Sequence, residues 1–413
     1  MCLLPYIHEY GIAQLIEGSS YPGTRTIPKL NAILSFVALK LSHIRRYSAD
    51  DLWCMDRGLG FFAGLNVLPK ATWFTSYSHR TTRKRNLHFL KSLATCWIKR
   101  GLLADTANLD FSTIPYWGEG AHLENNWSGT RHKALPSILA ALAQDPDSGM
   151  ITYGDTNVRQ DGKAEVAVEF LDFYRAGGAE DIKYLVCESK FTTSENLRKL
   201  DDRAIKFLTI RRRGKQIGDH RNAIPVSERT KIRVPAADGN KRLLQVLDEI
   251  IFLKDYGKQI RQVAITGRGK IKPALIITND FEISLENLVR KYARRWIVEK
   301  TISEQIEFFP LNHVSSSRVI KVDFDLTMTI LAHNLYRLLA LDLTGYSHRT
   351  AFSLYEKFLY NSGDVEISAN QVVIELKKRR HLPALLTAME PFQNKKIPFV
   401  ANKILTFRGA SRS

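Results

Sequence analysis

The order of apolar runs between residues 103 and 213 constrains the fold of this chain more than any other feature of its sequence. Polar turns that contain Gly, Asn or Asp separate three strand-like runs, and helices and strands alternate after them. The expected elements are strands at 108–117, 134–144 and 149–156, a helix over 163–178, a strand at 184–187, a helix over 194–202 and a strand at 205–213. This order predicts a mixed sheet covered by helices, and therefore an α/β fold.

The segments on either side of this core have other patterns. Residues 1–98 are predicted to be helical, and strand-like pieces with Gly-containing turns predict a β-rich insertion after residue 213. A single long helix is expected over 284–309, with Ser284 as its N-cap, and more helices are expected after residue 318. The predicted divisions are 1–98, 99–213, 214–283, 284–345 and 346–413, of which the second and fourth form the core and the last is helical.

The charge of the chain indicates a polyanionic partner. The net charge is +18, from 60 Lys and Arg against 42 Asp and Glu, and nucleic acid is the commonest polyanion that such proteins bind. The alternative is a basic protein whose charge only keeps it in solution. Two short helices before the basic cluster 80–85 could form a helix-turn-helix, but any helical bundle produces that pattern.

The cysteines and the longest apolar segments have ordinary explanations. Cys2, Cys54, Cys96 and Cys187 stand singly, which is typical of reduced packing residues and not of a disulfide frame or a zinc site. The N-terminus has no pattern of a secretory signal. The apolar segment at 326–341 contains His333, Asn334 and Arg337, which argue against a membrane span, and leucines at helical spacing, so it is predicted to be a core helix.

Two acids lie where the predicted core strands could bring them together. Asp110 follows Leu109 in the first strand, where acids are rare unless they have a partner or a function. Glu188 comes directly after the strand at 184–187. If these strands are neighbours, their carboxylates repel each other, and a divalent cation would relieve that repulsion. Taken singly, Asp110 could be a satisfied strand acid and Glu188 a loop acid.

A third acid, Glu299, lies on the predicted long helix. Tyr292, Arg295 and Glu299 stand at i, i+3 and i+7, so they share one helical face. Arg295 and Glu299 alone could be a surface ion pair that stabilises the helix by about 0.2–0.5 kcal/mol. Acids on two strands and on a late helix, in a basic protein, favour a shared site.

These stretches together resemble the insertion-sequence DDE transposases, in the group with a β-rich insertion before the last catalytic helix. Residues 109–120 are similar to the first-acid segment, 184–200 to the second-acid segment, and 292–309 to the Tyr-x2-Arg-x3-Glu helix of that family. The resemblance covers most of the chain, from residue 19 to residue 341. It implies an RNase H-like mixed sheet flanked by helices, with a β-rich insertion and helical N- and C-terminal regions.

The resemblance also implies an activity. Asp110, Glu188 and Glu299 would be the catalytic acids and would hold two Mg²⁺ or Mn²⁺ ions for DNA cleavage and strand transfer at the ends of an insertion sequence. The N-terminal helical region would bind DNA. The partners would be double-stranded DNA, as terminal inverted repeats and as target, and further copies of the chain in a homodimer or higher assembly. The protein would be prokaryotic, cytoplasmic, nucleoid-associated when bound to DNA, and without a membrane partner.

The resemblance further implies which residues contact DNA. The expected DNA-binding residues are Tyr292, Arg294, Arg295, Trp296, Arg211, Arg212 and Arg213. Arg295 would hold a phosphate through its planar guanidinium. Trp296 is either a core residue, which is the favoured interpretation, or a base-stacking wedge.

The chain departs from the family pattern at two positions. Ile306 stands where the family often has Lys, so a phosphate contact is absent or comes from another residue. Glu188 stands where the family usually has Asp, and its additional methylene moves the carboxylate by roughly 1.5 Å. A misplacement of about 1 Å can lower a rate on the order of 10²-fold. The chain also begins within the region that resembles the first helices of the family, so we expect an N-terminal DNA-binding segment to be absent.

Two other functions remain open at this point. One is a degenerate or repurposed transposase that binds DNA without cutting it, because Glu188 is a poor metal ligand. The other is an unrelated basic metal nuclease, which would cut DNA without end specificity and without joining.

Overall fold

A ten-stranded mixed sheet dominates the computed structural model, which describes residues 1–44, 51–115, 123–128, 132–178, 182–211, 229–235, 241–266, 274–311 and 319–410. The strand order is β2-β3-β1-β5-β6-β10-β9-β8-β7, and β4 pairs with β3 outside this path. The strands are β1 (Thr106–Pro115), β2 (Asn125–Ser128), β3 (Lys133–Gln144), β4 (Ile151–Val158), β5 (Tyr184–Cys187), β6 (Lys206–Ile210), β7 (Thr230–Pro235), β8 (Lys241–Leu253), β9 (Lys258–Thr266) and β10 (Ala274–Thr278).

The centre of the sheet has the arrangement that the sequence predicts. Strand β1 runs antiparallel to β3, with Asp110 opposite Leu142, and parallel to β5, with Leu109 opposite Cys187. Strand β5 continues parallel to β6. The α/β fold class is therefore confirmed, and so is the neighbourhood of the two strands that carry or precede the acids. The short strand β2 was not predicted.

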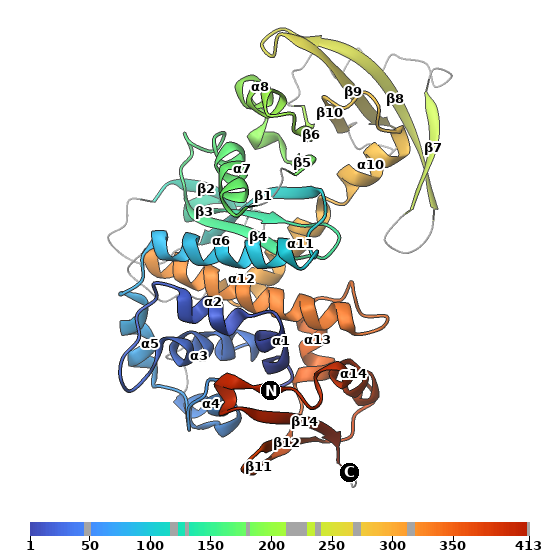
Figure 1. The fold of residues 1–413 in the computed structure, drawn as a ribbon. Coiled ribbons are helices and arrows are strands. Elements are labelled where there is room, and N and C mark those ends of the chain that lie inside the picture. The colour runs from blue at the N-terminus through green and yellow to red at the C-terminus, as the bar shows by residue number, and fades with distance from the viewer. Residues whose placement is uncertain are drawn as a thin grey trace.

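The strands of the predicted insertion extend this central sheet. Strand β10 pairs antiparallel with β6, with Ile276 opposite Ile210, and β9, β8 and β7 follow in antiparallel order. Figure 1 shows the long β8 and β9 strands reaching to the upper right, away from the helical part. The backbone hydrogen bonds of β10 thus join the β-rich segment directly to the core.

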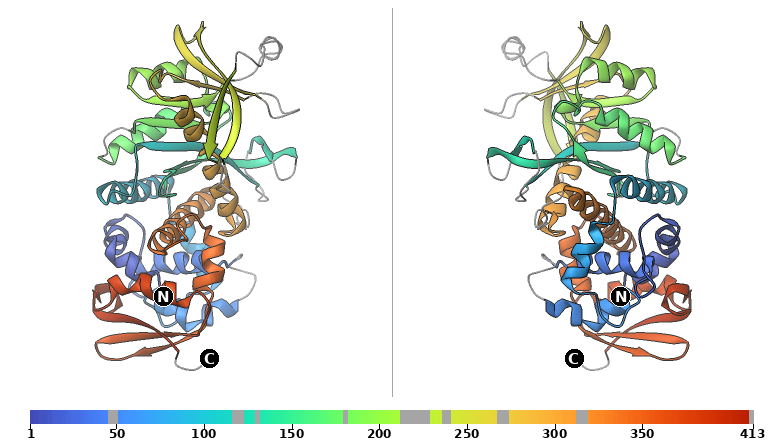
Figure 2. Two further views of the ribbon diagram at one scale, coloured as in Figure 1. Left: turned by 90° about the vertical axis from the view of Figure 1, so that its right-hand side faces the viewer. Right: turned by 90° about the vertical axis from the view of Figure 1, so that its left-hand side faces the viewer.

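Helices cover both faces of the sheet and form a layer below it (Figures 1 and 2). They are α1 (Leu4–Glu9), α2 (Ile12–Gly18), α3 (Lys29–Leu41), α4 (Arg57–Phe62), α5 (Ala71–Ser78), α6 (Arg83–Lys99), α7 (Val166–Ala176), α8 (Ser194–Asp202), α10 (Leu285–Ala293), α11 (Trp296–Glu307), α12 (Val319–Asp342), α13 (Ala351–Leu354) and α14 (Leu382–Met389). Alternate residues of β5 face two separate cores: Leu185 packs with α7 and α8, and Val186 packs with α10 on the opposite face.

Helix α12 is the core helix that the apolar segment at 326–341 predicts. Its residues from Val322 to Ala340 are buried almost all round, between β4 and the N-terminal helices. Lys40 of α3 donates to Asp325 Oδ2 at 2.7 Å and to the Phe309 carbonyl at 2.9 Å, so a buried ion pair joins α3 to α12. In the described residues, no helix is long and apolar enough to cross a bilayer.

The C-terminal region holds a second sheet in addition to the predicted helices. Helices α13 and α14 are present as expected, but four strands that were not predicted form a sheet with the order β11-β12-β14-β13. These strands are β11 (Gly363–Ile367), β12 (Gln371–Leu376), β13 (Lys396–Ile397) and β14 (Lys403–Gly409). The four cysteines form no disulfide, in agreement with the sequence analysis.

Candidate active site

Asp110 is held in the middle of β1 by one arginine and by its own backbone. Thr106, Asn108 and Asp110 alternate with apolar residues, so the three polar side chains lie on one face of the strand. Asp110 is only 4% exposed. Its Oδ1 accepts from the Phe111 N–H at 2.8 Å, and its Oδ2 accepts from Arg295 Nη1 at 2.5 Å. The strand acid thus has a charged partner from a distant part of the chain.

Glu188 lies beside Asp110 because of the strand register. Leu109 of β1 stands opposite Cys187 of β5, so the next residues of the two parallel strands are Asp110 and Glu188. The Glu188 side chain is 22% exposed and lies 3.1 Å from Lys190 Nζ. Among the described residues, its buried Oε1 accepts no hydrogen bond. This oxygen is the one that faces the Lys190 ammonium group, so an ion pair with Lys190 already offsets part of the Glu188 charge.

The helix that carries Glu299 is interrupted, contrary to the prediction of a single helix over 284–309. Helix α10 begins after Ser284, whose hydroxyl accepts from the Asn287 N–H as expected, but it ends at Ala293. Helix α11 begins only at Trp296. Tight i→i+3 hydrogen bonds connect the two, from the N–H of residue 295 to the carbonyl of 292 and from 297 to 294.

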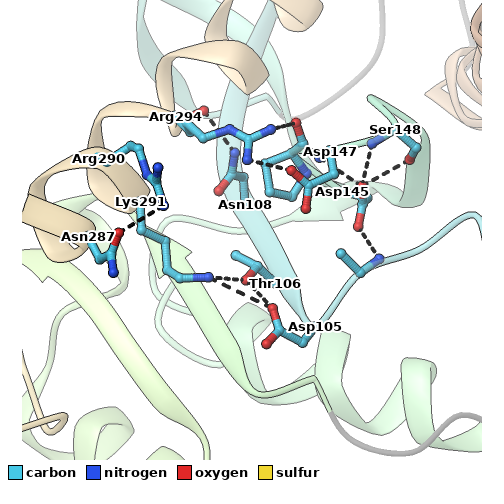
Figure 3. Close-up of polar contacts among 12 residues, drawn as sticks. Asp105, Thr106, Asn108, Asp145, Asp147, Ser148, Asn287, Arg290, Lys291 and Arg294 are labelled. Atoms are coloured by element: carbon cyan, nitrogen blue, oxygen red, sulfur yellow. Dashed lines mark hydrogen bonds and ion pairs between the residues drawn. The ribbon is translucent and has the colours of Figure 1, made fainter. Parts of the chain in front are cut away.

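Strand β1 fixes the position of this interruption. Asn108, which is fully buried, donates through Nδ2 to the Arg294 carbonyl at 3.0 Å (Figure 3). That carbonyl lies where the i→i+4 pattern changes to i→i+3, so a side chain of the sheet holds a backbone group at the break. The next residue, Arg295, can then reach Asp110.

Arg295 connects two of the three acids. Its Nη1 bonds Asp110, and its Nη2 lies 2.6 Å from Glu299 Oε1. The alternative of a plain surface pair between Arg295 and Glu299 is wrong, because Arg295 is 9% exposed and shares its guanidinium with a buried acid. The Glu299 side chain remains 40% exposed. The i, i+4 pair of Arg295 and Glu299 therefore lies between the helix and the sheet.

The charges of the other two acids affect the pKa of Asp110. Burial raises the pKa of Asp110 to about 7, and the charges of Glu188 and, more weakly, Glu299 act in the same direction, whereas Arg295 opposes the rise. Burial alone would lower the pKa of Arg295, but Tyr292, Asp110 and Glu299 raise it above its ordinary value. The site thus holds more negative charge than Arg295 neutralises.

The remaining predicted residues are found in different environments. Tyr292 is buried and bonds the Arg295 side chain. Arg294 pairs with Asp147, and Arg211 donates to Gln262 Oε1 at 3.0 Å. The favoured interpretation of Trp296 as a core residue is wrong, because its side chain is 61% exposed. Arg212 and Arg213 lie outside the described residues, and Ile306 is half-buried.

Sequence reasoning missed two residues of this site. Asn108 holds the helix break, and its position two residues before Asp110 in an alternating strand could have indicated that it faces the same way. Lys190 pairs with Glu188 across a single turn of 3₁₀-helix, and no pattern in the sequence indicates that pairing.

Comparisons with known proteins identify the family of the chain. A family described as transposase DDE domain matches residues 108–335, just over half of the chain. A piggyBac transposase, solved as a synaptic complex with hairpin DNA, is 12% identical with a TM-score of 0.46, and the match covers 86% of this chain and 76% of that one. The C-terminal lobe of a budding yeast Argonaute is 10% identical with a TM-score of 0.23, covering 65% and 64%. Both scores are too low to bear on function, and no curated protein matches the chain.

Proposed function

Because the chain belongs to the transposase DDE domain family, we propose that it is a DNA transposase that cuts phosphodiester bonds at the ends of an insertion sequence and joins those ends to target DNA. The observation that carries this proposal is the grouping of three acids from distant parts of the chain. Arg295 bonds Asp110 and Glu299, and the register of β1 and β5 brings Glu188 next to Asp110. We assign these three acids as the catalytic residues.

The donor chemistry of the three acids fits divalent cations. Carboxylate oxygens are the ligands that Mg²⁺ and Mn²⁺ prefer, and the pKa of Asp110, raised to about 7 by burial and by Glu188, reflects negative charge that a cation would offset. In the described parts of the chain, no three His, Cys, Asp or Glu side chains already form a metal-binding group. Asp110, Glu188 and Glu299 would hold two ions once Arg295 releases its two partners. Bound ions would stabilise charge on the attacking and leaving oxygens of the phosphodiester.

The release of Arg295 would give this residue a second role. Its guanidinium can donate two parallel hydrogen bonds to a DNA phosphate as readily as it now bonds two carboxylates. Buried Tyr292 bonds Arg295 and would orient it, so we assign Tyr292 as a positioning residue. The net charge of +18 supports double-stranded DNA as the partner, both as terminal repeats and as target.

A cleavage and strand-transfer assay tests this proposal. The substrate is duplex DNA that carries the ends of the element encoding the chain, with Mg²⁺ present. Asp110→Asn and Glu299→Gln should each lower cutting by at least about 10²-fold, because a misplaced or absent ligand disrupts the reacting geometry. Glu195→Gln on α8 is the matched control, since its acid pairs with Lys199 on the other face of the sheet. Cutting that survives both active-site substitutions would show that the acids are wrongly assigned.

A second candidate is a repurposed transposase that binds DNA without cutting it. The long side chain of Glu188 and its pairing with Lys190 favour this candidate. If it is correct, the wild-type chain binds terminal DNA without nicking it, and Glu188→Asp gains cutting by up to about 10²-fold. Cutting of any duplex, without joining, would instead indicate a basic metal nuclease.

A further inference from the structure

A cationic pocket lies at the start of β1, four residues before Asp110 in the middle of the strand. It has a volume of about 260 Å³ and lies between helix α10, the first residues of β1 and β5, and the turn after β3 (Figure 3). Its lining includes Thr106, Asp147, Tyr184, Arg290, Lys291 and Arg294. Three of these six residues are cations on neighbouring turns of one helix, so the pocket is basic although it opens beside an acidic site.

Lys291 is held at the floor of this pocket. Its Nζ donates to Thr106 Oγ1 at 2.6 Å, lies 4.2 Å from the centre of the Tyr184 ring, and is 3.8 Å from Asp105. Burial lowers its pKa, the acids Asp105 and Asp147 oppose this shift, and the positive charges of Arg294 and Lys183 add to it more weakly. The ammonium group is therefore fixed in place by Thr106, by the Tyr184 ring and by an ion pair with Asp105.

Arg294 and Arg290 complete the cationic wall. Arg294 pairs with Asp147 and donates to the Pro146 carbonyl at 2.5 Å. Arg290 is exposed and donates to the side-chain oxygen of Asn287 at 2.8 Å, and within the described ranges it forms no ion pair with an acid. Arg290 and Arg294 stand at i and i+4, a spacing at which like charges destabilise a helix. An anion between them would remove that repulsion.

We propose that this cationic pocket binds a backbone phosphate of the DNA whose scissile bond lies at the three acids. The inference rests on the proposed function and extends it to a second contact on the same substrate. Arg290 supplies the unneutralised charge, Lys291 a fixed ammonium group, and Arg294 a guanidinium that Asp147 holds until DNA competes for it.

The spacing of the two sites suits one DNA strand. Thr106 and Asp110 are four residues apart on β1, which corresponds to about 13 Å along an extended strand. Phosphates of one DNA strand are separated in space by more than their rise of about 3.4 Å per nucleotide, because the strand winds around the axis, so the pocket would lie only a few nucleotides from the cut. Both sites lie on the face of β1 that α10 and α11 cover, so the backbone need not cross the sheet.

Salt-dependent binding of random-sequence duplex DNA to the full chain, followed by fluorescence anisotropy, tests the pocket. Arg290→Gln should weaken binding roughly five- to tenfold and lower the slope of log K against log salt by about 1, because one phosphate contact is lost. Arg198→Gln is the matched control, because Arg198 is an exposed arginine of α8 on the opposite face of the sheet. Equal effects of the two substitutions would overturn the proposal.

A gain of affinity is the stricter test, since misfolding cannot produce it. Asp147→Asn should tighten DNA binding and steepen the salt slope, because it releases Arg294. Asp172→Asn is its control: Asp172 pairs with Arg203 on the other face at 2.7 Å, and its side chain is 59% exposed against 57% for Asp147. If both substitutions tighten binding equally, only net charge matters and the pocket has no role.

Two further outcomes separate the pocket from the proposed function and from other phosphates. A wild-type chain that fails to bind duplex DNA overturns the proposed function, whereas binding in which Arg290→Gln matches Arg198→Gln overturns the pocket alone. Millimolar inorganic phosphate, added at constant ionic strength, should leave DNA binding unchanged. A loss that occurs in the wild type but not in Arg290→Gln would assign the pocket to free phosphate.

Discussion

Two parts of strand β1 lie against the interrupted helix α10–α11 but collect opposite charges: its first residues, called here the basic end, and its middle at Asp110, called here the acidic end. At one end the side chain of Asp110 is 6% exposed and shares the buried Arg295 with Glu299. At the other end, Arg294 is 38% exposed and its partner Asp147 is 57% exposed. Water can therefore compete for the Arg294–Asp147 pair but not for the Arg295–Asp110 pair. The stability of the fold should therefore depend strongly on the buried ion pair and only weakly on the exposed one, whatever the sign of the charges.

The helix interruption is what separates the two ends. Arg294 and Arg295 are adjacent in sequence, yet Arg294 bonds Asp147 and Arg295 bonds Asp110. Asn108 lies between them on β1 and holds the Arg294 carbonyl. In this structure, two consecutive arginines thus reach two distinct sites.

Removal of one cation at each end should give the largest difference in the free energy of unfolding. Arg295→Met leaves Asp110 buried beside Glu188 without its counter-charge, so we expect a loss of about 3–5 kcal/mol in the free energy of unfolding at pH 8. Lys291→Met at the basic end should cost no more than about 1 kcal/mol, because that group is partly exposed. Urea denaturation measures both values, and equal losses would remove the distinction drawn between the two ends.

The stability of the protein should depend on pH through Asp110 at the acidic end. The pKa of Asp110 is near 3.8 when the chain is unfolded and about 7 when it is folded, so between these values the folded state holds a proton that the unfolded state has lost. Its contribution to stability is therefore complete below pH 3.8 and is lost as the pH rises to 7, by no more than about 4 kcal/mol.

The Asp110→Asn variant isolates this contribution, because it cannot titrate at that position. The wild type should lose stability relative to the variant between pH 4 and 7, and Mg²⁺ should restore stability at pH 8 only in the wild type. Parallel stability curves for the two proteins would contradict the raised pKa.

Loss of the Asn108 side chain should lower stability less than loss of Arg295 does, and it should act on both ends. Asn108→Ala removes the donor to the Arg294 carbonyl, so we expect a loss of about 1–3 kcal/mol in unfolding free energy. Because the junction places Arg294 and Arg295, DNA affinity and DNA cutting should both fall. A variant that loses stability but keeps both activities would show that Asn108 is structural only.

The sequence predicted the elements whose patterns are local. The strand-like runs and the strand–helix–strand order were sufficient to predict a mixed sheet, whereas the pairing of β1 with β5 was only a condition, which the structure meets. The acids could be placed together because each occupies a fixed point on one of those elements. Whether they are catalytic remains a prediction.

The sequence could not predict features that depend on distant contacts. Nothing between Tyr292 and Glu299 breaks a helix by propensity, since no Gly or Pro occurs there, and the interruption depends on Asn108 from another element. Because the break precedes Trp296, the apolar stripe of α10 does not continue in phase, and Trp296 faces water. The small C-terminal strands were missed because β11 is exposed along its whole length and shows no buried face.

The buried pair of Lys40 and Asp325 has a practical consequence for dissection of the chain. Lys40 belongs to a helix near the N-terminus, whereas Asp325 lies on α12, which packs beneath the ten-stranded sheet. Excision of the first helices to obtain a minimal nuclease fragment would expose the apolar flank of α12 and deprive Asp325 of its ammonium partner. Such a fragment should aggregate on expression, and co-expression of the two pieces should rescue it.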